Sequence, residues 1–288
     1  STVATLAGTQ TLTNKTLTSP VATGTVDING NLDVDGGTIK LDGNYPVGTD
    51  NVALGNTALD SVEAGGINNV AIGDNAGTAI TTGDHNTAVG KDALLSNTTA
   101  SNNTAVGIES LMCNTTGTAN LALGAYAMCK NTTANNNTAV GAAALLANTT
   151  GANNTGVGKD SLIANTTGAN NVAVGYLSLD ANTTGATNVA MGRGSLGANT
   201  TGSCNVAIGD LALVAATTVS QNTAIGMLSM TATTSGIRNT AVGRQSMCAN
   251  TTGCCNVAMG SNALASGTTG DFNVAVGGAS LGSINTGN

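Results

Sequence analysis

Apolar and polar positions repeat with a fixed period over most of the chain. The phrase Asn-x-[Ala/Gly]-x-Gly begins at fourteen sites, from Asn51 to Asn273, with one interval of 18 residues followed by twelve of 17. Counting each unit from its Asn, position 4 is aliphatic or Met, position 5 is Gly and position 8 is Ala or Ser. Position 9 is Leu or Met in every unit except the one that carries Gly77. Such a register predicts a stacked repeat architecture.

Within each unit, the pattern predicts short strands rather than a helix. Gly at position 5 and the recurring Asn-Thr-Thr-Gly at positions 12 to 15 would break a helix within two turns. Positions 1 to 5 alternate as in a strand, with positions 2 and 4 on one face and Ala at position 3 on the other. We expect a second short strand at positions 7 to 10. In the unit that starts at Asn171, the corner is Gly175 and the turn runs from Asn182 to Gly185.

Each unit is then one coil of a parallel β-solenoid, an all-β fold in which every coil pairs with its two neighbours. We expect about 14 coils with a 17-residue period over residues 51–288, preceded by a small β adaptor or attachment segment at residues 1–50. The predicted interior holds the aliphatic residue of position 4 and the Leu or Met of position 9. Examples are Val140, Leu145, Val174, Leu179, Ile208 and Leu213.

Small side chains form a second periodic set, at positions 3 and 8. They include Ala139, Ala144, Ala173 and Ser178. Because one Val and one Leu per coil bury little apolar area, we expect three chains to pack these strips around a common axis as a homotrimer. The alternative is that the small residues fit tight corners inside one coil, and periodicity alone does not separate the two.

Composition narrows the functional classes. The chain has no Trp, one Phe and three Tyr, so aromatic platforms for sugar recognition are nearly absent and we do not expect receptor binding on the shaft. A net charge of -7 with only eight Lys and Arg argues against nucleic-acid binding. No apolar run reaches the 18 residues of a membrane span, so we expect no membrane insertion.

Candidate catalytic and metal-binding residues are sparse. His85 is the sole histidine, and we expect it to be a solvated loop residue, without a catalytic triad or zinc site. Asp33-Val-Asp35-Gly-Gly resembles a calcium loop but lacks its remaining ligands, which favours alternating strand residues. Of six cysteines, Cys113 and Cys129 lie on adjacent predicted coils and have a spacing that permits an approach, although reduced thiols are favoured. We expect no catalytic residue, no metal and no cofactor.

Asn-Thr-Thr recurs in eight units. The Asn residues are Asn97, Asn114, Asn131, Asn148, Asn165, Asn182, Asn199 and Asn250. Each is formally an N-glycosylation sequon, but the interpretation we favour is a turn whose Asn side chain bonds to the following backbone and stacks as a ladder. Rows of Thr are also typical of ice-binding solenoids. Adjacent Thr residues in a strand point to opposite faces, which argues against that function.

The repeat phrases resemble two protein families. Asn-Val-Ala-Ile-Gly at 69–73 and 205–209 is similar to the coil motif of YadA-like trimeric autotransporter adhesin heads, a resemblance that covers residues 51–288 and implies a trimeric left-handed parallel β-roll. The sequence of the unit from Asn137 is more similar to a second family. It resembles the Asn-Thr-Ala-Val-Gly-x-x-Ala-Leu-x-x-Asn-Thr-Thr-Gly arrays of bacteriophage tail-fibre proteins. GTQTLTNKTLTSP at 8–20 is similar to a phrase in phage tail and fibre proteins, and residues 38–59 resemble the entry to such arrays in marine phages.

These resemblances imply a structural rather than enzymatic role. We expect the shaft of a phage tail fibre in the virion tail, assembled in the host cytoplasm, which spaces a receptor-binding tip from the particle. The implied partners are other copies of the chain, tail or baseplate proteins, and a host receptor reached through a tip outside this chain. The alternative is a bacterial surface adhesin or extracellular fibre of the trimeric-autotransporter type.

Overall fold

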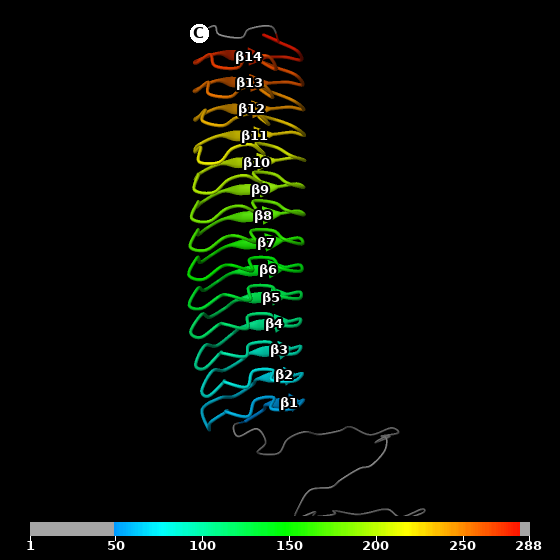
Figure 1. Ribbon diagram of the computed structural model, residues 1–288, viewed down its shortest axis with the longest axis vertical. Coiled ribbons are helices and arrows are strands. Elements are labelled where there is room, and N and C mark those ends of the chain that lie inside the picture. Colours follow the sequence, from blue (N-terminus) through cyan, green and yellow to red (C-terminus); the bar gives the residue numbers. More distant parts are fainter. Residues whose placement is uncertain (1–48, 283–288) are drawn as a thin grey trace, which may run out of the picture. The chain divides into compact units, whose positions relative to one another are not determined.

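The computed structural model describes residues 49–282. The predicted adaptor at residues 1–50 therefore lies almost entirely outside the described residues, as do Asp33 and Asp35. The described part is a stack of coils that follow one another in sequence order (Figure 1).

Fourteen strands of three residues each form one parallel sheet, ordered from β1 to β14 as they occur in the chain. They are β1 (Val52–Leu54), β2 (Val70–Ile72), β3 (Thr87–Val89), β4 (Thr104–Val106), β5 (Leu121–Leu123), β6 (Thr138–Val140), β7 (Thr155–Val157), β8 (Val172–Val174), β9 (Val189–Met191), β10 (Val206–Ile208), β11 (Thr223–Ile225), β12 (Thr240–Val242), β13 (Val257–Met259) and β14 (Val274–Val276). Equal coil positions pair, as in Val172↔Val189 and Ala173↔Ala190. The predicted parallel β-solenoid is confirmed.

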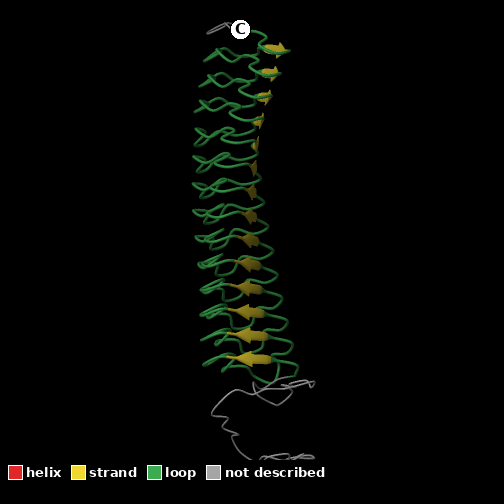
Figure 2. Ribbon diagram, turned by 90° about the vertical axis from the view of Figure 1, so that its right-hand side faces the viewer, coloured by secondary structure: helices red, strands yellow, loops and turns green. Residues whose placement is uncertain are grey.

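Each coil contributes a single strand, at positions 2 to 4, and the sheet lies along one side of the stack with turns on the other (Figure 2). The predicted second strand at positions 7 to 10 was wrong, because that segment is a run of turns. In the coil that starts at Asn154, the backbone has φ 57° at Asp160 and 51° at Leu162, left-handed values that a strand does not contain. The Ser161 N–H donates to Gly158 O at 3.3 Å, closing the first turn.

These turns still bond from coil to coil. The Leu162 N–H donates to Ser178 O in the next coil at 3.1 Å, and equivalent bonds recur along the stack. A left-handed Leu is costly for the backbone by about 1 kcal/mol or more. The position 9 side chain is fully buried in return, so the energy of burial offsets the strain.

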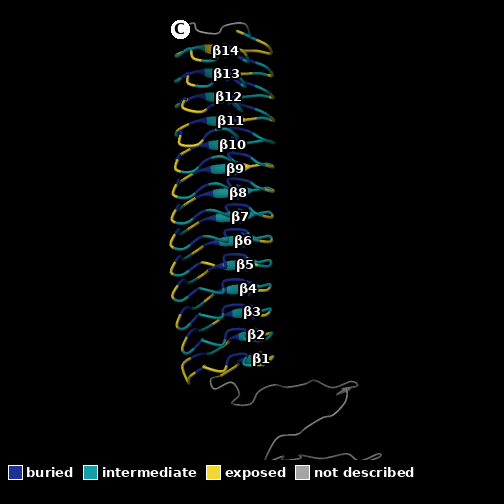
Figure 3. Ribbon diagram, viewed as in Figure 1, coloured by how far each residue is buried: buried dark blue, intermediate teal, exposed yellow. Residues whose placement is uncertain are grey.

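The interior of the coils is lined by positions 3, 8 and 9. Leu145, Leu179 and Leu213 at position 9 are completely buried, as predicted. Val140, Val174 and Ile208 at position 4 were wrongly assigned to the core, because they are only half-buried. Figure 3 colours the chain by burial along the whole stack.

The narrowness of the coil decides which strand face is inside. At Gly156, which takes the place of the usual Ala at position 3, an added Cβ would already lie 3.0 Å from Ser161 Oγ and 3.4 Å from Leu145 Cγ. A Val or Ile there would collide with the position 8 and 9 side chains. The Ala face must therefore turn inward, which places positions 2 and 4 outward.

The predicted subunit interface through small residues was also wrong. Ala139, Ala144, Ala173 and Ser178 are completely buried within one chain. A side chain that is completely buried within its own chain has no surface left for contact with a second chain. The alternative, that small residues fit the tight interior of a single coil, is the correct one.

Gly77 is the one exception at position 9, and a residue of its own coil fills the space. Ile80 stands at position 12, where most other coils carry Asn, and is 1 % exposed. A Cβ on Gly77 would lie 3.0 Å from Ile80 Cδ1 and 3.1 Å from Leu59 Cδ2. The Ile side chain thus occupies the volume that a position 9 Leu fills elsewhere, and the apolar interior continues without a gap.

Candidate functional site: the outward face of the sheet

The outward face of the sheet consists of the side chains at positions 2 and 4 of every coil. Position 2 is Val, Thr or Leu, and position 4 is Val, Ile, Leu or Met. Several of the position 4 side chains are among the most exposed large apolar groups of the described residues: Leu54 at 49 %, Met259 at 46 %, Met191 at 41 % and Ile72 at 38 %. No charged residue occurs at either position.

The parallel register makes this face continuous. Val174 pairs with Met191, and Met191 with Ile208, so the half-buried and exposed side chains of position 4 stack in a row from β1 to β14. At a strand spacing of about 4.8 Å, the row is roughly 60 Å long, and three residues give it a width of about 10 Å. The resulting strip covers roughly 600 Å² and is largely apolar, with Thr at position 2 of six coils. Exposed apolar patches of a few hundred Å² often bind other molecules.

Two ladders of buried Asn side chains hold the coils in register behind the sheet. At position 1, the Asn171 backbone N–H donates to Asn154 Oδ1 at 2.9 Å, and its Nδ2 donates to Gly185 O at 2.8 Å. At position 12, Asn182 Nδ2 donates to Asn165 Oδ1 at 2.8 Å and also to Gly185 O at 3.0 Å. Both ladders therefore meet at the position 15 carbonyl, and neighbouring coils satisfy the buried amides of this coil.

The ladder decides between the two interpretations of the Asn-Thr-Thr phrases. All eight Asn residues are buried, and their Nδ2 atoms donate hydrogen bonds inside the stack. A glycan attached to such a nitrogen would have to pass through the coil wall. The turn with a stacked Asn side chain is confirmed, including the turn that runs from Asn182 to Gly185.

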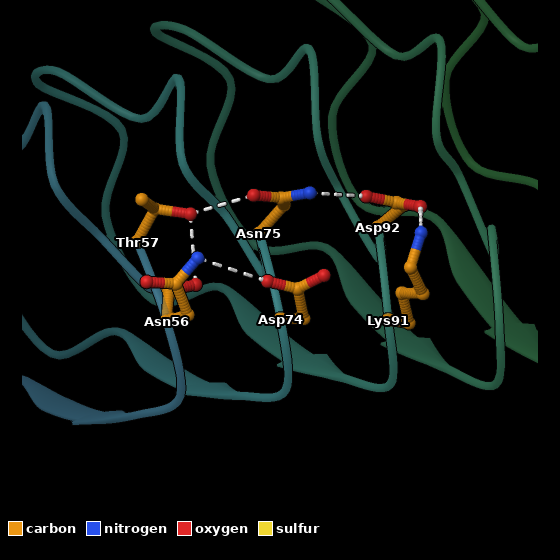
Figure 4. Close-up of polar contacts among 6 residues, drawn as sticks. All are labelled: Asn56, Thr57, Asp74, Asn75, Lys91 and Asp92. Carbon is orange, nitrogen blue, oxygen red and sulfur yellow. Dashed lines mark hydrogen bonds and ion pairs between the residues drawn. The ribbon is translucent and has the colours of Figure 1, made fainter.

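Charged and polar side chains form a column at positions 6 and 7, beside the strands rather than on their outward face (Figure 4). Thr57 Oγ1 donates to Asn75 Oδ1 at 2.6 Å, Asn75 Nδ2 donates to Asp92 Oδ1 at 2.8 Å, and Lys91 Nζ lies 2.7 Å from Asp92 Oδ2. In parallel, Asn56 Nδ2 donates to Asp74 Oδ1 at 3.3 Å.

The same column continues along the stack. Lys159 pairs with Asp160 at 2.7 Å and lies 5.4 Å from the ring centroid of Tyr176, while Arg193 contacts Asp210 of the next coil at 2.8 Å. The hydrogen bond from Lys91 and that from Asn75 hold the pKa of Asp92 below its ordinary value. Asp92 is therefore held as a carboxylate, and its pairing with a cation and an amide does not prepare it as a proton donor.

The remaining candidate residues are His85 and the six cysteines. His85 is an exposed loop residue at position 17, with Nε2 3.4 Å from Asn68 Nδ2. All six cysteines are free thiols. Within residues 49–282, no group of three or more His, Cys, Asp or Glu side chains is arranged to hold a metal ion.

The outward face is the feature that sequence reasoning misplaced. Its signal was present: position 3 is always Ala or Gly, whereas positions 2 and 4 carry larger side chains and never a charge. A strand whose inner face is restricted to Ala requires a narrow interior, and the large residues must then face outward.

The described residues contain no helix with the length and apolar character that crossing a membrane requires. A comparison with known proteins finds no family model and no curated protein that match this chain. The fold itself defines the class: the chain is a parallel β-solenoid repeat protein.

Proposed function

We propose that residues 51–288 are the non-enzymatic structural shaft of a phage tail fibre, which holds a receptor-binding tip outside this chain away from the virion. The observation that carries the proposal is the unbroken register of fourteen strands, with equal positions paired from β1 to β14. A stack that adds about 4.8 Å per coil supplies length and stiffness. The phage assignment is supported by the resemblance of the unit at Asn137 and of residues 8–20 to tail-fibre phrases.

The fibre is a homotrimer in this proposal, with the outward sheet face at its centre. Three such faces packed around a common axis would remove the outward side chains at positions 2 and 4 from water. Each chain would bury roughly 600 Å², close to the ~800 Å² per partner of a standard protein interface. The charged column at positions 6 and 7 would remain at the rim, where polar groups are tolerated.

Light scattering on the purified chain tests this assembly. The expected mass is about 83 kDa, three times the 27.8 kDa of one chain. Val174→Asp with Ile208→Asp places two charges on the outward face and should yield monomers with an unchanged circular dichroism spectrum. The matched control, Thr184→Asp with Thr218→Asp, charges exposed position 14 side chains of the same coils and should stay trimeric. A monomeric wild type, or a trimer that tolerates the outward charges, contradicts the homotrimer.

Electron microscopy separates the phage fibre from its alternative, a surface adhesin or extracellular fibre of the trimeric-autotransporter type. The alternative is favoured by the Asn-Val-Ala-Ile-Gly phrase at 69–73. Gold-labelled antibodies against the repeat region should mark the tail of phage particles from the source culture and leave cell surfaces unlabelled. Labelling of bacterial surfaces without labelled particles would contradict the phage fibre and favour the adhesin.

A further inference from the structure

Cys113 and Cys129 are direct neighbours in successive coils. Cys113 stands at position 11 of the coil that starts at Asn103, and Cys129 at position 10 of the next coil. The Cys113 N–H donates to the Cys129 carbonyl at 3.0 Å. The two backbones are thus about one coil spacing apart, roughly 4.8 Å, which lies within the 4.4–6.8 Å range of Cα separations that a disulfide spans.

The two thiols differ in burial. Cys129 is buried, whereas Cys113 is partly exposed. Burial is the main reason that the pKa of the Cys129 thiol is raised to about 11, and the charge of the neighbouring Cys113 is the next contribution. The Cys113 thiol is therefore the more accessible of the two.

The other four cysteines have different surroundings. Cys248 Sγ donates to Ala265 O at 3.5 Å, and Cys254 Sγ donates to Thr252 O at 3.3 Å. Cys204 and Cys255 stand at position 17, three coils apart. Within the described residues, Cys113 and Cys129 are the one pair joined by a backbone hydrogen bond between coils.

We propose that Cys113 and Cys129 are an oxidisable pair, which a low-molecular-weight disulfide such as oxidised glutathione converts into an intrachain disulfide between two successive coils. The partly exposed Cys113 thiolate attacks one sulfur of oxidised glutathione, forming a mixed disulfide and releasing one glutathione thiolate. Cys129 then loses its proton to solvent, attacks the Cys113 sulfur and displaces the second glutathione. Two protein thiols are oxidised, and one glutathione disulfide is reduced to two glutathione thiols.

This link would clamp the coil of β4 to the coil of β5. It closes a short loop around the turns between them, so those two coils can no longer separate when the stack opens locally. The inference does not depend on the shaft function, because it concerns one chain and two adjacent coils. A phage fibre and a surface fibre would both meet oxidising conditions only after leaving the cytosol.

Peptide mapping under non-reducing conditions tests the proposal. The variant Cys204→Ser, Cys248→Ser, Cys254→Ser and Cys255→Ser retains only the pair, and it is incubated folded with oxidised glutathione at pH 8. The expected result is a fall from two free thiols per chain to none, and one intrachain peptide that joins positions 113 and 129. Dithiothreitol should restore both thiols. Two free thiols, two separate glutathione adducts, or a link between two chains would overturn the proposal.

Two further variants of that protein check the order of events and the geometry. Cys129→Ser should stop at a glutathione adduct on Cys113, and an unmodified Cys113 in this variant would refute the first step. Cys129→Ala with Leu146→Cys moves the second thiol to position 10 of the following coil, roughly 10 Å from Cys113 by coil spacing. That separation exceeds the disulfide range, so this variant should form no intrachain link. If it links as readily as the native pair, local unfolding rather than the folded geometry produces the bond.

Discussion

Asn199 and Ala216 occupy position 12 in successive coils, and no described residue donates a hydrogen bond to the buried Oδ1 of Asn199. Elsewhere in the ladder, the Asn of the following coil supplies that bond, as Asn165 does to Asn148 Oδ1 at 2.8 Å. Ala216 has no amide to donate. The ladder that begins at Asn97 therefore ends at Asn199, with one buried acceptor left over.

Restoring the missing amides should stabilise the stack. Ala216→Asn supplies a donor to Asn199 Oδ1, but its own Oδ1 would then face Thr233, so the unpaired acceptor moves up by one coil. Thr233→Asn added to it would connect the ladder through to Asn250. Because a buried unpaired polar group costs about 1–3 kcal/mol, we expect the double variant to gain about that much. The single Ala216→Asn should change stability by well under ~1 kcal/mol.

Hydrogen exchange across residues 199–250 and thermal melting monitored by circular dichroism measure these gains. The informative quantity is the coupling between the two substitutions, which should be positive because each completes the other's hydrogen bonds. As a control, Thr201→Asn adds an amide at the exposed position 14 of the coil that carries Asn199 and should leave both readouts unchanged. Strictly additive effects of the two substitutions would show that the ladder is not a connected network.

The interior and the outward face of one coil should respond differently to truncation. Leu179→Ala empties a completely buried position 9, for which large-to-small changes cost about 2–5 kcal/mol. Val174→Ala trims a half-buried outward side chain and should cost less than ~1 kcal/mol of coil stability. Hydrogen exchange of residues 171–187 reports the coil directly. An equal loss of exchange protection in the two variants would show that Val174 contributes to the core as much as Leu179 does.

The period, the parallel stacking and the alternation of the strand could be predicted from the sequence, because each depends on local chemistry. Gly175 sets a corner, the Asn182 to Gly185 segment sets a turn, and Leu179 is buried by its apolarity. These choices act within one coil and recur in most of the others.

What the pattern left open is which way each face turns. Alternation places Ala173 opposite Val174 but does not say which is inside. That choice depends on the width of the coil, set by the distance from the strand to the turns at positions 8 and 9. Left-handed Leu residues such as Leu162, with φ 51°, form those turns, and propensity argues against them. The expected second strand failed because left-handed turns occupy that segment, and the interface assigned to Ala173 failed because that side chain is buried inside the coil.

Gly175 should not tolerate a side chain. Its φ is +134°, and a Cβ built on it would lie 2.7 Å from Gly192 O in the next coil. Gly175→Ala therefore combines backbone strain with a backbone collision, and we expect a loss of about 2 kcal/mol or more. Gly65→Ala is the control, since its nearest contact would be an ordinary 3.4 Å to the Thr82 side chain. Thermal melting of the two variants should show a lowered midpoint for Gly175→Ala alone, and similar midpoints would mean that the coil-to-coil spacing is adjustable.

Asp180 should make stability depend on pH in the direction opposite to a salt-bridged carboxylate. Burial, with a smaller contribution from the charge of Asp160, raises the pKa of Asp180 above its ordinary value of 3.8. The folded chain then binds this proton more tightly than the unfolded chain, so stability attributable to Asp180 is present at low pH and is lost as pH rises from 3.8 through the folded pKa. Asp180→Asn removes the titration, and its advantage over wild type should be largest near neutral pH.

Unfolding midpoints of wild type and Asp180→Asn between pH 3 and pH 7 test this sign. The difference between them should grow with rising pH and become constant once Asp180 is ionised in both states. Asp60 holds the same position 10 in the first coil but is exposed, so Asp60→Asn is the matched control for removing a carboxylate at this place in the repeat. A difference for Asp180→Asn that stays constant over the whole range would show that the substitution acts through packing, and that burial of the carboxylate carries no electrostatic cost.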